Sequence, residues 1–349
     1  MTSLSSSVTI LVPTRNRPRE LHRLLSFFSY AGNSHAVHVL DGSTREVQDQ
    51  NASMVGWFYF ASHESYDPEL HLGLRCASAL RKVSTPYVVF CGDDDFVFPD
   101  ALTQCAEYLD KHADYSVVSG NVLSLRYLYD KPLLRYGVML KNSFQFIGFT
   151  AHEHFLQRAL YSFAYSYLGT PPLYYGLRRT DSAREAFYQM TADLKYSGVE
   201  LLSNSIALIR GKVAILEFPF GLRDYSCAAI REPERDNPGT YLSADDIEFI
   251  KPILTSALAT EENLSHELAQ NYVELYLTQW QPPDWVAPHL KPPTIGFPEK
   301  AAMAVDLVRS ILTPDAIAAR QQIPSGVMRA LLRSQGEFIR RCMLEIRHR

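Results

Sequence analysis

The sequence predicts an α/β fold in which helices flank a mostly parallel sheet, followed by a helical C-terminal region. Two features of the first hundred residues predict this fold. Short runs rich in β-branched residues alternate with helical stretches, which is typical of a wound sheet with parallel strands. Each apolar run then ends in a polar cluster of turn-forming residues. The alternating segments are 8–12, 19–30, 36–40, 74–82 and 87–91.

Polar clusters follow three of the predicted strands. They are 13–18, which reads Pro-Thr-Arg-Asn-Arg-Pro, 41–43, which reads Asp-Gly-Ser, and 92–95, which reads Gly-Asp-Asp-Asp. In an open α/β sheet, ligands bind outside the carboxyl ends of the strands. We therefore expect the three clusters to converge on one ligand site.

The pattern continues less regularly after residue 114. A strand is expected at 115–119, and a segment rich in aromatic residues extends over 144–175. A helix is expected at 200–209, because Gly211 suits the residue after a helix and the cations on either side of it suit the negative helix end. A strand at 213–218 follows this helix.

The character of the chain changes after Pro238. Ser243 is expected to cap a helix with an acidic first turn, and apolar residues follow it at helical spacing. A proline-rich stretch at 282–298 cannot be helical. We therefore expect an α/β domain at 1–238 and a helical C-terminal region at 239–349.

The composition excludes several classes of protein. The 349 residues carry a formal net charge of −4 and a pI near 6.3, so the overall charge does not attract nucleic acid. The five cysteines are scattered and form no CxxC pair, which argues against a disulfide framework or a zinc site. The N-terminus lacks the pattern of a signal peptide, and no apolar run reaches about 18 residues. We expect a cytoplasmic protein without a membrane-spanning segment.

The C-terminal tail is basic and amphipathic, because arginines alternate with apolar residues over 329–349. Such a segment either packs as a terminal helix with one solvated face or lies on an anionic membrane surface. The second alternative would place the protein peripherally at the inner face of the membrane.

Three consecutive aspartates, Asp93, Asp94 and Asp95, follow the apolar run 87–91. Adjacent carboxylates repel one another unless a positive group relieves them. A hard divalent cation does so, and oxygen ligands suit Mg²⁺ or Mn²⁺ that also binds phosphate oxygens. The alternative is a solvated loop or a helix N-cap. The position directly after a predicted strand favours the metal.

Three segments together resemble the opening elements of family 2 glycosyltransferases, which have the GT-A fold. They are VTILVPTRNRPRELHRLLSFF, HVLDGS and TPYVVFCGDDDFVFPDAL, in the family's order and spacing. The resemblance covers about residues 7–110 and extends more weakly to about 225. It implies a Rossmann-like domain for nucleotide-sugar binding and catalysis, in which Pro13, Thr14 and Arg15 approach the nucleotide. Asp41 would accept a hydrogen bond from the uracil or another base.

The resemblance assigns the family's metal motif to the aspartate triplet. Gly92 stands where many relatives carry another acidic residue, so the division of roles within the triplet is open. We expect Asp93 and Asp94 to face the nucleotide and Asp95, together with Asp94, to bind the Mn²⁺ or Mg²⁺. Arg75 lies in a segment that matches the family loosely, and we expect it to contact the base or a phosphate.

The resemblance also implies two residues for the chemistry. An inverting transferase needs a base for the acceptor hydroxyl, and a carboxylate at the start of a helix is a common solution. Glu200 lies where the family carries this residue. Asp193 is a rival, because the sequence has valine before Glu200 and not the family's acidic pair. Arg223 is expected to reach the departing diphosphate and to offset its charge.

These observations predict a metal-dependent glycosyltransferase that moves a sugar from a nucleotide-sugar donor, UDP-linked, to an acceptor hydroxyl with inversion. The acceptor would be a glycan, a lipid-linked molecule or a protein. One alternative is a sugar-phosphate nucleotidyltransferase, but the loop 13–18 lacks the glycines that such enzymes carry there. The other alternative is a non-catalytic nucleotide-binding or assembly module on the same fold.

Overall fold

The computed structural model describes residues 7–127, 138–142, 148–150, 155, 173–191, 194–224 and 243–278. Ten strands within these ranges form one sheet, in the order β3-β2-β1-β4-β9-β6-β10-β5, with β7 beside β6 and β8 beside β10. The strands are β1 (Val8–Thr14), β2 (Ala36–Asp41), β3 (Ala61–Ser65), β4 (Tyr87–Phe90), β5 (Phe96–Val97), β6 (Tyr115–Tyr127), β7 (Val138–Asn142), β8 (Gly148–Thr150), β9 (Leu177–Arg179) and β10 (Lys212–Asp224).

The predicted mostly parallel sheet is confirmed. Strands β3, β2, β1 and β4 are parallel neighbours, and β6 is parallel to β10. The short strand β9 lies antiparallel between β4 and β6, so β6 and β10 run in the same direction as the first four strands. The remaining short strands, β5, β7 and β8, pair antiparallel with their neighbours.

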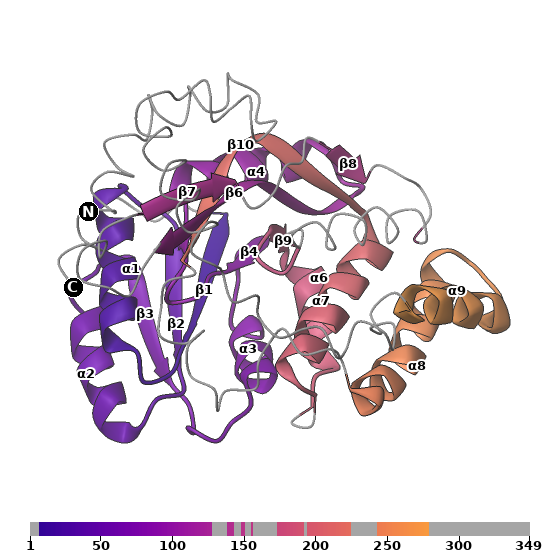
Figure 1. Ribbon diagram of the computed structural model, residues 1–349, viewed down its shortest axis with the longest axis horizontal. Coiled ribbons are helices and arrows are strands. Elements are labelled where there is room, and N and C mark those ends of the chain that lie inside the picture. The colour runs from indigo at the N-terminus through magenta and orange to yellow at the C-terminus, as the bar shows by residue number, and fades with distance from the viewer. Residues whose placement is uncertain are drawn as a thin grey trace, which may run out of the picture.

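Helices cover both faces of the sheet (Figure 1). On one face, Leu24 of α1 and Leu102 of α4 belong to the same buried cluster as Ile10 of β1. On the other face, Phe187 of α6 and Ile206 of α7 pack in one cluster with Leu11 of β1. The helices are α1 (Pro18–Tyr30), α2 (Arg45–Val55), α3 (Leu72–Leu80), α4 (Pro99–Lys111), α6 (Thr180–Tyr188), α7 (Tyr196–Arg210), α8 (Ala244–Glu261) and α9 (His266–Thr278).

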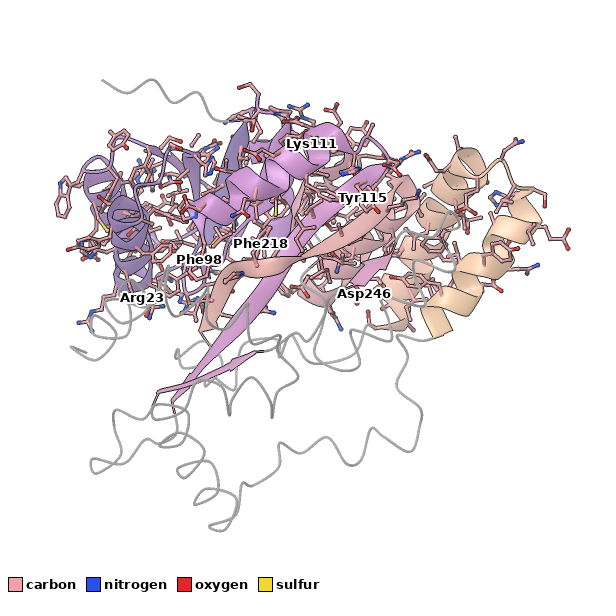
Figure 2. The ribbon with its side chains drawn as sticks, turned by 90° about the horizontal axis from the view of Figure 1, so that it is seen from above. Arg23, Phe98, Lys111, Tyr115, Phe218 and Asp246 are labelled. Carbon is pink, nitrogen blue, oxygen red and sulfur yellow. The ribbon has the colours of Figure 1, made fainter. Side chains whose placement is uncertain are left out.

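The C-terminal helices α8 and α9 extend the second of these layers. Ser243 caps α8 as expected, since its hydroxyl accepts a hydrogen bond from the backbone N–H of Asp246, at 3.1 Å. The Asp246 carboxylate also accepts a hydrogen bond from the backbone N–H of Lys195, at 3.1 Å, directly before α7. Figure 2 labels Asp246 at the start of α8. The same view shows α4, which ends at Lys111, along strands β6 and β10. The two helices therefore share a core with α7, while the division of the chain at residue 238 stays a prediction.

Several predicted bounds need correction. Strand β10 continues from 218 to Asp224, and helix α7 begins at Tyr196, so Glu200 lies in its second turn and not at its start. Helix α2 and strand β3 were not predicted, because the pattern of polar and apolar residues in this part of the sequence has no clear helical or strand period. The aromatic segment 144–175 is described only in part, and the proline-rich stretch and the basic tail lie outside the described residues. Among the helices that the structure describes, none combines the length and the apolar character needed to cross a bilayer.

The strand order reverses between β1 and β4. From β1 the chain proceeds outward to β2 and β3, and then it returns across β1 to form β4 on the other side. Such a reversal of strand order separates the loops that follow the two central strands, and ligands of open α/β sheets bind there. The loops that follow β1 and β4 carry two of the predicted clusters.

Candidate active site

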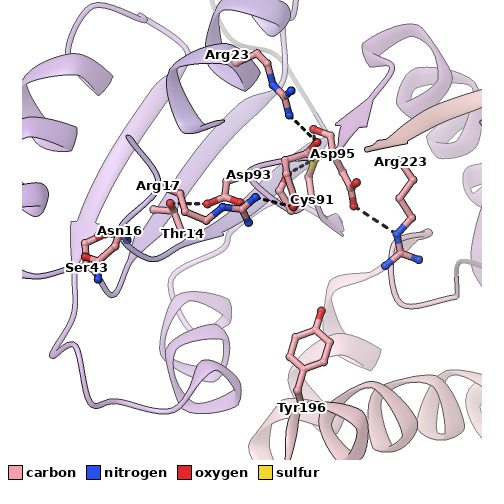
Figure 3. A network of polar contacts seen from close by, with 12 residues as sticks. Thr14, Asn16, Arg17, Arg23, Ser43, Cys91, Asp93, Asp95, Tyr196 and Arg223 are labelled. Carbon is pink, nitrogen blue, oxygen red and sulfur yellow. Dashed lines mark hydrogen bonds and ion pairs between the residues drawn. The ribbon is translucent and has the colours of Figure 1, made fainter. Parts of the chain in front are cut away.

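The loops after β1 and β4 meet at the aspartate triplet (Figure 3). Thr14, the last residue of β1, donates a hydrogen bond from its hydroxyl to Asp93 Oδ2 at 2.7 Å. The second oxygen of Asp93, Oδ1, lies 2.7 Å from Nη1 of Arg17, the residue directly before α1. Both oxygens of Asp93 are therefore held by groups from the β1 loop, as the predicted convergence requires.

Asp93 is almost fully buried, with 3% of its surface exposed. Burial raises the pKa of this carboxyl to about 7, because water no longer stabilises the charge. The Arg17 guanidinium opposes this rise and the neighbouring Asp94 carboxylate adds to it. The charge of Asp93 therefore depends on the Arg17 cation beside it.

One carboxylate oxygen of Asp94 and one of Asp95 lie close to Gly92. A Cβ atom placed on Gly92 would lie 2.9 Å from Asp94 Oδ1 and 3.4 Å from Asp95 Oδ2. The glycine thus leaves room for these two carboxylate oxygens, which a side chain at this position would displace. Among the described residues, no three His, Cys, Asp or Glu side chains come together as a metal site. Two carboxylates nevertheless fit Mg²⁺ or Mn²⁺, because these ions take their other ligands from phosphates and water.

Arginines surround the triplet on three sides. Arg17 Nη2 lies 2.7 Å from Asp94 Oδ2, so one guanidinium bridges two carboxylates. Arg23 donates a hydrogen bond to the Asp94 carbonyl oxygen at 3.0 Å and lies over the Phe96 ring. Arg223 Nε lies 3.7 Å from Asp95 Oδ2. The sequence analysis named Arg223, placed Arg17 in the cluster 13–18 without assigning it a role, and missed Arg23. The demand of three adjacent carboxylates for counter-ions is the signal that could have pointed to both.

Arg223 links the triplet to the candidate base on α7. Its guanidinium lies 4.6 Å from the centre of the Tyr175 ring, and the Tyr175 hydroxyl lies 3.0 Å from the hydroxyl of Tyr196. Burial raises the pKa of Glu200, against the charge of Arg223 and a hydrogen bond from Tyr196. Glu200 therefore belongs to the same group of side chains as the triplet. Its rival Asp193 lies outside the described residues.

Asp41 has no exposed surface. Its carboxylate accepts hydrogen bonds from Ser43 N at 2.8 Å and from Asn51 Nδ2 at 2.8 Å, and it lies 3.0 Å from His63 Nε2. Burial alone would raise its pKa, but the hydrogen bonds from His63, Ser43 and Asn51 outweigh burial and hold the pKa below the usual value. Asp41 thus anchors the loop after β2, and its contact with a nucleotide base stays a prediction.

The remaining predicted nucleotide-binding residues lie around the same strand ends. Arg75 is buried and donates hydrogen bonds to the carbonyl oxygens of Thr14, at 3.1 Å, and Leu40, at 3.4 Å, so it caps the ends of β1 and β2. Pro13 is partly buried within β1, and Arg15 is exposed, 3.5 Å from Glu69. Contact of these three residues with a nucleotide stays a prediction.

The sheet topology and the strand-end cluster define an α/β domain of GT-A type. Known structures support this class. Two crystal structures of residues 1–349 of S. aureus TarS, one of them in complex with UDP-GlcNAc, match the fold with TM-scores of 0.52 and 0.56. They share 14% and 15% sequence identity with this chain, and the match covers 89% of this chain and 82% and 83% of theirs.

A sequence comparison matches part of the chain to a known family. Residues 9–159 match the family described as Glycosyl transferase family 2. The match includes the first three motifs and confirms their resemblance to this family. No protein of curated function matches the sequence.

Proposed function

We propose that this protein transfers a sugar from a UDP-linked donor to an acceptor hydroxyl, with inversion at the anomeric carbon and with a divalent cation at Asp94 and Asp95. The observation that carries the proposal is the meeting of the triplet with Thr14 of β1 and Arg223 of β10 at the carboxyl ends of the strands. The presence of UDP-GlcNAc or UDP in similarly folded S. aureus TarS structures supports a UDP-linked donor. The GT-A domain, 1–238, would bind the donor and carry the chemistry, and 239–349 would form a helical C-terminal region.

In the proposed reaction, Glu200 accepts the proton of the acceptor hydroxyl as its oxygen attacks the anomeric carbon. The bond from that carbon to the diphosphate breaks, and the electron pair leaves with the nucleoside diphosphate. Arg223 lies beside Asp95 and offsets the charge that develops on the leaving group. A bound divalent cation would supply further neutralisation of the diphosphate. The Thr14 and Arg17 contacts fix Asp93, and through it the loop that carries the other two aspartates.

The raised pKa of Glu200 suits a base, because a carboxylate whose pKa is brought closer to the working pH binds a proton more strongly. The location of the protein is also part of this proposal. We expect it to act in the cytoplasm on a glycan, lipid-linked or protein acceptor, with the basic tail available for contact with the membrane.

Calorimetry with UDP, in the presence and absence of Mn²⁺, tests the donor site. Metal-dependent binding of UDP is the expected result, and binding of UDP that Mn²⁺ does not alter would contradict the metal site. Donor-hydrolysis and transfer assays on Glu200→Gln and Asp193→Asn test the base. Loss of transfer in the first variant with retained UDP binding supports Glu200, whereas full transfer by both variants removes both candidates.

A further inference from the structure

Tyr175 lies between two residues that the proposed reaction uses. The centre of its ring lies 4.6 Å from the guanidinium carbon of Arg223. Arg223 in turn points to Asp95, with its Nε 3.7 Å from Oδ2 (Figure 3). The Tyr175 hydroxyl lies 3.0 Å from the hydroxyl of Tyr196, which stands one turn before Glu200 on α7. The proposed reaction gives roles to Arg223 and Glu200, and it leaves Tyr175 without one.

The Tyr175 ring is held from two sides. The preceding residue, Tyr174, is buried and stacks on Phe90, the last residue of β4, with ring centres 5.2 Å apart. The rings of Tyr174 and Tyr175 meet edge to face, with centres 5.0 Å apart. Aromatic pairs with these separations attract each other beyond the area that they bury. Tyr175 is therefore fixed to the strand that leads to the aspartate triplet and, through Tyr196, to the helix that carries Glu200.

Contact with an aromatic ring suits an arginine that must bind a phosphate. The ring quadrupole attracts a guanidinium that lies over the face of the ring. The N–H donors of a guanidinium lie in its own plane, so contact with the ring face uses none of them. The Arg223 side chain is 27% exposed, so a ligand from solvent can reach it. The ring thus limits the orientations of the guanidinium without occupying the donors that a diphosphate would accept from.

We propose that Tyr175 is a positioning residue, whose ring holds the Arg223 guanidinium beside Asp95 in the orientation that receives the diphosphate of the donor. The proposal rests on the proposed function, because it assumes that the diphosphate lies at Arg223. Ordering a long side chain on binding costs affinity, and a side chain that is already held loses less. The charge of the leaving group develops on the terminal phosphate of UDP, which UMP lacks. The ring should therefore favour UDP more than UMP.

Calorimetry with UDP and with UMP, both in the presence of Mn²⁺, tests the proposal. Tyr175→Leu should weaken UDP binding by about 2- to 30-fold, the range expected from the loss of a cation–π contact, and should leave UMP binding as in the wild type. Tyr175→Phe keeps the ring, so it should bind UDP within about twofold of the wild type. Tyr108→Leu is the matched control, because it removes a half-buried tyrosine ring from α4, on the other face of the sheet.

Arg223→Gln separates positioning from packing. In this background Tyr175→Leu should cause no further loss of UDP affinity, because the effect of the ring passes through the guanidinium. Tyr175→Met fills more of the space of the ring with a flexible side chain, and it decides the test if the leucine variant does not fold. Unchanged UDP affinity, equal losses for UDP and UMP, or the same loss with and without Arg223 would overturn the role of Tyr175 and leave the donor site intact. A wild-type protein that binds no UDP in the presence of Mn²⁺ would overturn both this role and the proposed function.

Discussion

Gly92 offers a direct test of where the metal binds, because a substitution there leaves all three aspartates in place. In Gly92→Ala the new methyl group would lie 2.9 Å from Asp94 Oδ1 and 3.4 Å from Asp95 Oδ2. The first distance is too short for a carbon and an oxygen, so the Asp94 carboxylate must move by about 0.5 Å. Metal sites tolerate errors in ligand distance of only about 0.2 Å. Displacement of a ligand group by this amount should weaken Mn²⁺-dependent UDP binding by about 10- to 100-fold.

Calorimetry with UDP and Mn²⁺ measures this change, and thermal unfolding without ligands verifies that the variant is folded. Gly56→Ala is the control, because its added methyl group would meet its nearest atoms at 3.4 and 3.6 Å, in ordinary contact. If Gly92→Ala binds Mn²⁺ and UDP as tightly as the wild type, the cation does not lie between Asp94 and Asp95. The reasoning from the two oxygens beside Gly92 would then be wrong, even if the protein is a metal-dependent transferase.

Three further predictions concern the base and the strand ends. The rate of transfer should fall as the pH is lowered through the pKa of Glu200. Because that pKa is raised, the fall should begin at a higher pH than for an ordinary glutamate. A pH–rate profile without this loss of rate at low pH would contradict the assignment of Glu200 as the base. Tyr196→Phe removes a hydrogen bond that lowers the pKa of Glu200. The fall in rate at low pH should therefore begin at a higher pH, with a several-fold loss of rate near neutral pH. An unchanged pH–rate profile would show that Tyr196 contributes only packing. Gly42→Ala should lower the free energy of unfolding by about 1–3 kcal/mol, because its methyl group would lie 2.1 Å from Nη1 of the buried Arg75. Urea unfolding measures this change. An unchanged midpoint would show that the Arg75 side chain can move aside.

The sequence predicted the first half of the fold because each local signal there agrees with the others. The run 8–12 is apolar except for Thr9, and the strand that it forms, β1, is buried on both faces by helices α1 and α3 and their neighbours. Strands of this kind appear as continuous apolar runs. By contrast, β3 has the sequence Ala-Ser-His-Glu-Ser and a half-exposed position at the sheet edge, so neither period nor composition identified it.

Convergence of the polar clusters followed from topology alone, but the partners of each side chain did not. Asp41 illustrates the difference. Its position after β2 was predicted, whereas its enclosure by Asn51 and His63 depends on the packing of α2 and β3, for which the sequence carries no clear signal. A motif therefore locates a residue at the site and does not establish which atoms it contacts.

For the aspartate triplet, the sequence correctly predicted a need for positive charge but not the residues that supply it. Three adjacent carboxylates do require positive charge, and the chain provides it through Arg17 and Arg223 before any ligand arrives. Along the sequence, Arg17 lies more than 70 residues before the triplet and Arg223 lies more than 120 residues after it. The same charges that make the ligand-free site stable also determine what can bind there. A divalent cation at Asp94 and Asp95 would enter a site that already holds two positive charges, so an anionic ligand that arrives with the cation would lower the repulsion.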